Sequence, residues 1–152
     1  MIISAQGQFA SSNGNNAVGK GYKADAMGDR ATAVGDMAVA HGDGASAKGK
    51  YSTAIGPLAS AEGTLAHAEG KSAKAVGTWA EAKGEGASAE GWGATSAGDF
   101  SIARGKGATA IDGGHALKEG SYAKGAGAIV SENDKPYTKS ISSQYANEEF
   151  PK

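Results

Sequence analysis

Glycine occupies every seventh position of this chain from Gly7 to Gly105 without exception. The frame then shifts by one inserted residue near Asp112 and resumes at Gly113, from which it continues to Gly127. A short period held over so many units decides the architecture before any local propensity does, because such units fold by stacking on one another. Disordered glycine-rich linkers have irregular spacing. The sequence therefore predicts a repeat protein with a seven-residue unit.

Each unit reads x-x-Ala-x-Ala-x-Gly, as in residues 29–35. Alanines two residues apart point to one face of an extended strand, and the residues between them point to the other face. A helix is excluded because glycine in every unit would cost about 1 kcal/mol each relative to alanine, and a coiled coil needs large a and d residues. Glycine at the end of each unit allows a sharp corner. The chain is therefore predicted to be all-β, a parallel β-solenoid over residues 1–128 with strands stacked about 4.8 Å apart.

Alanine takes the place of the large aliphatic residues of an ordinary core. It makes up most of the 39% of residues that count as hydrophobic. The formal net charge is −1 with acids and bases mixed along the chain, which leaves no basic cluster for nucleic acid or for an anionic membrane. No segment is apolar enough to insert into a membrane. Without cysteine there is neither a disulfide framework nor a thiolate metal site.

A slower period of three units runs through the outward-facing positions. Two apolar columns flank the same glycines at this step, with the parity opposite to the alanines. An exposed apolar row of this length is larger than a soluble monomer normally shows, and seven-residue units leave no loop to cover it. We therefore expect a lengthwise self-association interface closed by cyclic symmetry, formed by Val34, Met37, Ile55, Leu58, Val76, Trp79, Ala97 and Phe100.

The length of one coil stays open between three units and two. Stacking of like positions favours three units and three strands per coil. A flattened coil of two units and two strands suits alanine better, because a three-sided coil has a wide interior that alanine would underfill.

Residues 52–56 (Ser-Thr-Ala-Ile-Gly) and 31–35 (Ala-Thr-Ala-Val-Gly) resemble the S-x-A-I-G and A-x-A-x-G units of YadA-like head domains. Such heads occur in trimeric autotransporter adhesins, and similar repeats occur in phage tail-fibre proteins. The resemblance covers residues 2–130 and implies a left-handed parallel β-roll with three chains side by side. It also implies an extracellular position, on a bacterial surface or a phage virion. The chain shows no neck, stalk or anchor motif, so we expect an excised head or a virion protein.

The repeat pattern fails after Gly127. Residues 129–152 hold Pro136, Pro151 and several aromatic residues among acidic ones. Solenoids need atypical ends that block the open edge of the ladder. A non-repeat C-terminal cap is therefore the first interpretation of residues 129–152, and a tail or the start of a following domain are the alternatives.

No grouping of catalytic residues can be assembled from the sequence. Residues 14–20 match the spacing of a phosphate loop, but Gly21 replaces the Ser or Thr that would hold magnesium. His41, His67 and His115 occupy different positions within their units and cannot form one column. We therefore predict that the chain is not an enzyme and has no cofactor or metal.

Together these features predict a non-enzymatic, homotrimeric surface-binding module, an adhesin head or a phage tail-fibre tip, that recognises a glycan or protein on a host cell. Exposed aromatic residues, which can stack on sugar rings or protein, are the expected contacts: Tyr22, Trp92, Tyr122, Tyr137 and Tyr145. A structural spacer is the main alternative. Ice binding is another, through the threonine column Thr32, Thr53 and Thr95, although Lys74 interrupts that column.

Overall fold

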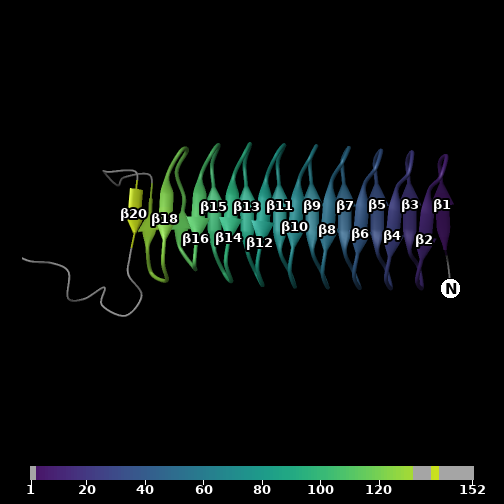
Figure 1. Ribbon diagram of the computed structural model, residues 1–152, viewed down its shortest axis with the longest axis horizontal. Helices are drawn as coiled ribbons and strands as arrows, with labels where there is room; N and C mark the ends of the chain where they lie inside the picture. The colour runs from purple at the N-terminus through teal and green to yellow at the C-terminus, as the bar shows by residue number, and fades with distance from the viewer. Residues whose placement is uncertain (1–2, 132–137, 141–152) are drawn as a thin grey trace, which may run out of the picture.

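Short strands joined by tight corners form a straight rod (Figure 1). The computed structural model describes residues 3–131 and 138–140. Every described strand is two or three residues long and pairs in parallel with strands two places away in sequence. The described part contains no helix that could cross a bilayer. The prediction of an all-β chain of stacked parallel strands is confirmed.

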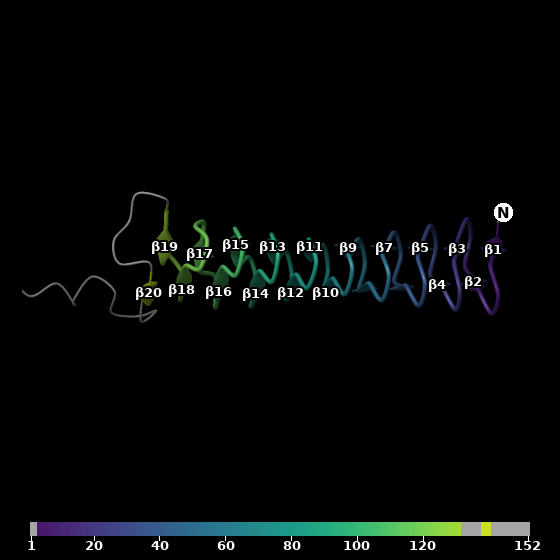
Figure 2. The same ribbon diagram turned by 90° about the horizontal axis from the view of Figure 1, so that it is seen from above.

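The odd-numbered strands form one sheet, here called the odd sheet, and the even-numbered strands form the even sheet (Figure 2). The odd sheet contains β1 Ser4–Gln6, β3 Val18–Lys20, β5 Thr32–Val34, β7 Ser46–Lys48, β9 Ser60–Glu62, β11 Lys74–Val76, β13 Ser88–Glu90, β15 Ile102–Arg104, β17 His115–Ala116 and β19 Ile129–Val130. The even sheet contains β2 Ser11–Asn13, β4 Asp25–Met27, β6 Val39–His41, β8 Thr53–Ile55, β10 His67–Glu69, β12 Glu81–Lys83, β14 Thr95–Ala97, β16 Thr109–Ile111, β18 Tyr122–Lys124 and β20 Thr138–Ser140. The corners that follow odd strands run along one long side of the rod, the odd edge, and those that follow even strands run along the other, the even edge.

One coil consists of two units and two strands. Lys74 of β11 stands opposite Ser60 of β9 on one side and Ser88 of β13 on the other, and each partner is two units away along the chain. Two strands per coil bring the sheets close enough for alanine side chains to fill the space between them. The three-unit coil that the outward columns favoured is therefore wrong, and the flattened coil that the alanines favoured is confirmed.

The interior is built almost entirely of alanine. The third and fifth residues of the units are buried, as Ala66 and Ala68 are in the middle of the rod. Buried serines replace some of the alanines and hydrogen-bond locally; Ser52 Oγ, for example, donates to the carbonyl oxygen of Gly49 at 2.9 Å. Val130 at the C-terminal end is the one larger aliphatic side chain buried among the described residues; along the rest of the described rod the large apolar residues project outward.

The corner position at the end of each unit requires glycine for two reasons. Gly63 has a φ of +130°, a conformation that residues with a side chain rarely adopt. A Cβ added to Gly63 would also lie 2.6 Å from the carbonyl oxygen of Gly77 in the next coil. Successive backbones are in contact at the corners, and this contact explains the seven-residue period.

The chain loses one residue near Asp112, where the sequence indicated an insertion. Thr95 of β14 pairs with Thr109 of β16, and Thr109 pairs in turn with Tyr122 of β18, so the second coil is one residue shorter than the first. Asp112 takes the corner place of a glycine, with a φ of +53°. Gly120 and Gly127, with φ of +67° and +84°, therefore stand at the second residue after a corner. The predicted insertion is wrong because φ is positive both at the corner and at the second residue after it. Glycine is favoured at both positions, so the glycine pattern alone does not distinguish them.

The apolar residues predicted to form one stripe lie on all four sides of the rod. Each coil has two units, so residues three units apart in sequence lie one and a half coils apart. Successive members of each predicted column therefore fall alternately on opposite sides of the rod. The pairs are Val34 and Val76 on the odd sheet, Ile55 and Ala97 on the even sheet, Met37 and Trp79 on the odd edge, and Leu58 and Phe100 on the even edge. The continuous stripe is therefore wrong, and a chain–chain interface has to be sought on one side at a time.

The ladder continues past residue 128, where the sequence pattern ends. β19 pairs with β17, and β20 pairs with β18. Ile129–Val130 and Thr138–Ser140 therefore extend the two sheets. Residues 132–137 and 141–152 lie outside the described residues. The interpretation of residues 129–152 as a cap, a tail or the start of a following domain therefore stays a prediction.

Candidate binding surface along the odd edge

One large apolar side chain per coil lines the odd edge over seven successive coils. These residues are called the ridge: Phe9, Tyr22, Met37, Tyr51, Leu65, Trp79 and Trp92. All are exposed, from 40% for Met37 to 68% for Phe9. At the usual ladder spacing of about 4.8 Å per coil, the row is roughly 29 Å long. An exposed apolar row of this kind marks an interaction site on a soluble protein.

Backbone hydrogen bonds hold the second corner position, where all ridge residues except Tyr22 and Trp92 lie, in register along the edge. The second residue after each corner glycine donates its N–H to a carbonyl oxygen of the preceding coil, as Met37 does to Tyr22 at 2.7 Å and Tyr51 to Asp36 at 2.9 Å. The same bond recurs coil after coil, so the residues of the edge are kept in register. A ligand therefore meets a surface that is already organised for contact.

Five of the ridge residues lie in the left-handed backbone region, among them Met37 with a φ of +57° and Trp79 with a φ of +66°. This conformation costs a residue with a side chain about 1–2 kcal/mol. Glycine takes the same corner position at Gly93 and Gly107, so the fold does not require a large side chain there. Leu58 and Phe100 on the other edge share this backbone conformation but stand apart from each other, so it is the unbroken row of large side chains along the odd edge that supports a functional role.

Three lysine side chains lie over aromatic rings of the ridge. The distance from Nζ to the ring centroid is 5.4 Å for Lys23 over Tyr22, 5.4 Å for Lys50 over Tyr51 and 5.6 Å for Lys106 over Trp92. None of these lysines forms an ion pair within the described part of the chain. The cation–π contacts therefore hold positive charge beside the rings without neutralising it.

Charged side chains on the two sheets are largely paired with each other. On the odd sheet, Lys74 Nζ lies 3.3 Å from a carboxylate oxygen of Glu90. On the even sheet, the hydrogen bond with the Glu81 carboxylate raises the pKa of Lys83 above its ordinary value. Such exposed pairs add little stability, but they engage most of the charged groups of the sheets, whereas the three lysines over the ridge rings have no ion-pair partner within the described residues.

The even edge is polar, and its acidic residues serve the backbone. Asp29 Oδ1 accepts a hydrogen bond from the N–H of Asn15 at 2.9 Å, and Asp43 Oδ1 accepts one from the N–H of Asp29 at 3.0 Å. Leu58 and Phe100 stand on this edge three coils apart, so they form no continuous row. Among the residues that the structure describes, no three metal-ligating side chains gather at one point.

The structure places two of the five predicted contact residues on the ridge. Tyr22 and Trp92 belong to it, whereas Tyr122 is half-buried and projects from β18 of the even sheet. Tyr137 and Tyr145 lie outside the described residues. The threonine column is divided as well, because Thr32 is on the odd sheet and Thr53 and Thr95 are on the even sheet. These threonines therefore do not form a flat row.

Sequence reasoning named four of the seven ridge residues, Met37 and Trp79 as interface and Tyr22 and Trp92 as contacts, but it did not place them in one row. It missed Phe9, Tyr51 and Leu65 because it grouped the units in threes. When the units are read in pairs, the second corner position gives Phe9, Lys23, Met37, Tyr51, Leu65 and Trp79 in successive coils. Tyr22 and Trp92 fill the row from the adjacent position where Lys23 and Gly93 interrupt it. The signal was therefore present at a step of two units.

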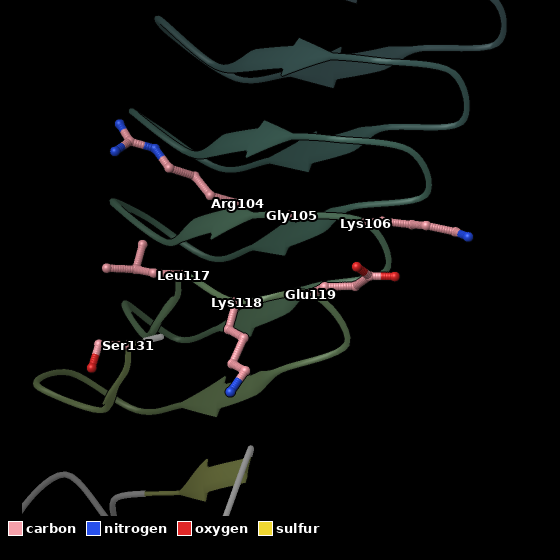
Figure 3. A pocket seen from close by; sticks show the side chains of 7 residues that line it. All are labelled: Arg104, Gly105, Lys106, Leu117, Lys118, Glu119 and Ser131. Atoms are coloured by element: carbon pink, nitrogen blue, oxygen red, sulfur yellow. The ribbon is translucent and has the colours of Figure 1, made fainter. Parts of the chain in front are cut away.

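An open hollow lies at the C-terminal end of the odd edge. It is lined by Arg104, Gly105, Lys106, Leu117, Lys118, Glu119 and Ser131 (Figure 3). Lys106 and Glu119 project to one side of the rod, while Arg104 and Leu117 project to the other. The residues that line it include no histidine.

The family model for the YadA head domain repeat (2 copies) matches residues 26–47, 47–64 and 68–94. These segments are YadA head repeats. They run from β4 to the corner before β14 and hold Met37, Tyr51, Trp79 and Trp92 of the ridge. No protein of the curated set matches the chain. A match to this repeat indicates a head module of the adhesin type.

Proposed function

We propose that this chain is a non-enzymatic surface-binding module that acts outside the cell and contacts a host cell-surface ligand through the ridge. One observation carries the proposal: seven successive coils each hold an exposed large apolar side chain on the same edge, five of them in strained backbone. Packing within the rod does not call for these side chains, since glycine serves at the same position elsewhere. The YadA head repeats support an adhesin-type role, on a bacterial surface or a phage particle.

The module is proposed to act as a homotrimer, as its YadA head repeats suggest. The ridge is poorly suited to the three-fold axis. Three copies each of Lys23, Lys50 and Lys106 would meet there without the carboxylate partners that buried cations need. The trimer contact is therefore assigned to a sheet, which leaves the ridges free for a ligand.

The even sheet is the better face for this contact. β6, β8, β14 and β16 carry no lysine, arginine or carboxylate; between them lie Glu69 of β10, hydrogen-bonded to His67, and the Glu81–Lys83 ion pair of β12. Every odd strand from β3 to β15 except β5 carries a charged residue. Val39, Ile55 and Ile111 project outward from these uncharged even strands. Three even sheets around a common axis would bury these side chains from all three chains.

Ile55→Asp combined with Ile111→Asp is expected to convert the trimer into monomers, because the interface would then hold six carboxylates without partners. Sedimentation equilibrium measures the change, and circular dichroism checks that the rod remains folded. The control is Val34→Asp with Val76→Asp on the odd sheet, which should stay trimeric. If only the control variant dissociates, the interface lies on the odd sheet. If the wild type is already monomeric, the proposed homotrimer is contradicted.

Tryptophan fluorescence reports on the ridge alone, because both tryptophans of the chain, Trp79 and Trp92, belong to it. Envelope fragments of candidate host cells, titrated into the full chain, are expected to shift the emission to shorter wavelength and to reduce quenching by acrylamide. Contact would remove water from the exposed rings. Binding without a change in emission would place the contact on another side. Failure to bind any bacterial or animal cell surface would favour a structural spacer.

A further inference from the structure

The ridge offers a straight and narrow contact along an outer edge of the rod. Its side chains come one per coil at intervals of about 4.8 Å, and the corner hydrogen bonds keep them aligned. A globular partner would touch such an edge over a few coils only. A thin, extended polymer can follow the whole row, so the shape favours a linear polymer as the ligand.

The ridge side chains suit a polymer of sugar rings better than a peptide. Pyranose rings present faces of C–H groups that pack on aromatic rings and on apolar chains such as Met37 and Leu65. An extended peptide would seek unpaired backbone groups at a sheet edge. The N–H groups of Met37 and Leu65 are already bonded to the carbonyl oxygens of Tyr22 and Lys50 in the preceding coil, so recognition must pass through side chains.

The charge on the ridge selects among sugar polymers. Lys23, Lys50 and Lys106 lie over its rings without ion-pair partners in the described part of the chain. The neighbouring Asp36 is engaged elsewhere, because its Oδ1 accepts a hydrogen bond from the N–H of Tyr22 at 3.2 Å. The lysines are therefore available to acidic groups on a ligand.

We propose that the ridge binds a linear anionic polysaccharide that lies along the rod. Its sugar rings pack on the ridge, and its carboxylate, sulfate or phosphate groups contact Lys23, Lys50 and Lys106. This inference rests on the proposed function, because it names the ligand class of the same site. Three ridges on one trimer then engage three stretches of polymer, and weak contacts add up to avid binding.

A membrane surface and single-stranded nucleic acid fit the ridge less well. Three ridges around a three-fold axis point in different directions, so they cannot all lie on one flat bilayer. Nucleic acid bases also stack on aromatic side chains, but a phosphate on every nucleotide calls for many cations. Within the described residues, only three lysines lie over the rings of the ridge, and Asp36 and Glu119 are on the same edge. This is too little positive charge for a phosphate on every nucleotide.

The test uses the full chain and five probes. Polygalacturonate carries carboxylates and heparin carries sulfates, amylose is neutral, and an oligothymidylate and phosphatidylglycerol vesicles represent the other two ligand classes. One or both anionic polysaccharides are expected to bind with a shift in tryptophan emission and to bind at least about tenfold more tightly than amylose. Added salt should weaken this binding, because it screens the exposed charges.

Two lysine variants separate ridge charge from net charge. Lys23→Gln with Lys50→Gln and Lys106→Gln is expected to weaken binding about tenfold, from three modest exposed charge contacts. The matched control changes three lysines on the odd sheet and the even edge, Lys20→Gln, Lys48→Gln and Lys71→Gln, and should bind like the wild type. Circular dichroism should show both variants folded.

Each contrary outcome has a definite meaning. Equal affinity for amylose, or ridge and control variants of equal affinity, would overturn the anionic character of the ligand. Tighter binding to vesicles or oligothymidylate than to any polysaccharide would overturn the ligand class. If host-cell fragments shift the tryptophan emission but neither anionic polysaccharide binds or competes, this inference fails and the proposed function stands. If the fragments do not bind, the proposed function itself fails.

Discussion

Gly63→Ala is expected to destabilise the rod by about 2–6 kcal/mol, a large effect for the addition of one methyl group. Residues with a side chain rarely adopt the φ of +130° found at this corner, and forcing one there costs about 1–3 kcal/mol. The new Cβ would also stand 2.6 Å from the carbonyl oxygen of Gly77, and overpacking of this kind adds about 1–3 kcal/mol. Urea denaturation followed by circular dichroism, at fixed protein concentration, measures the change.

The control for this prediction is Gly93→Ala. Gly93 has a φ of +65°, and a Cβ added there would meet no heavy atom within 4 Å. Only the cost of the left-handed backbone remains, about 1–2 kcal/mol. If both substitutions destabilised the rod equally, contact between successive coils would not be the reason for the glycine period.

The seven-residue period was sufficient to predict the fold class but not the size of the coil. A corner glycine in every unit, such as Gly63, is compatible with two or three strands per coil. The width of the interior decides between two and three strands per coil. The small volume of the buried alanines indicates a narrow interior and therefore two strands. Outward positions such as Val34 and Ile55 face solvent, so their period need not follow the coil. Giving weight to them produced both the three-unit coil and the single stripe.

The candidate surface was predicted only in part for a related reason. Tyr22 and Trp92 were predicted as contact residues, but Tyr51 and Leu65 were not. Which residues stand next to them on the edge depends on the number of units per coil, so the row they belong to was not visible. Once the coil is known to hold two units, the row from Phe9 onward can be read directly from the sequence. The strained backbone of these residues could not be read in advance, since left-handed φ is normally expected of glycine.

Tyr51→Asn combined with Trp79→Asn is expected to abolish most ligand binding and to leave the rod as stable as before. Aromatic side chains at the centre of a contact contribute roughly 2 kcal/mol or more each, so the loss of two should lower the affinity of one ridge by about 1,000-fold. Asparagine tolerates the left-handed region better than most residues, and Asn16 already occupies the same corner position with a φ of +62°. Relief of strain then offsets the lost contacts, and stability should change by less than about 1 kcal/mol.

The matched control is Leu58→Asn with Phe100→Asn on the even edge. These residues have φ of +61° and +58° and are 63% and 65% exposed, close to the values of φ +66° and 61% for Trp79. The backbone change and the loss of exposed apolar area are therefore similar, and only the edge differs. Because Leu58 and Phe100 stand alone in a polar edge, their replacement should leave cell binding unchanged. Equal loss of binding in both pairs would mean that scattered apolar contacts, and not the ridge, hold the ligand.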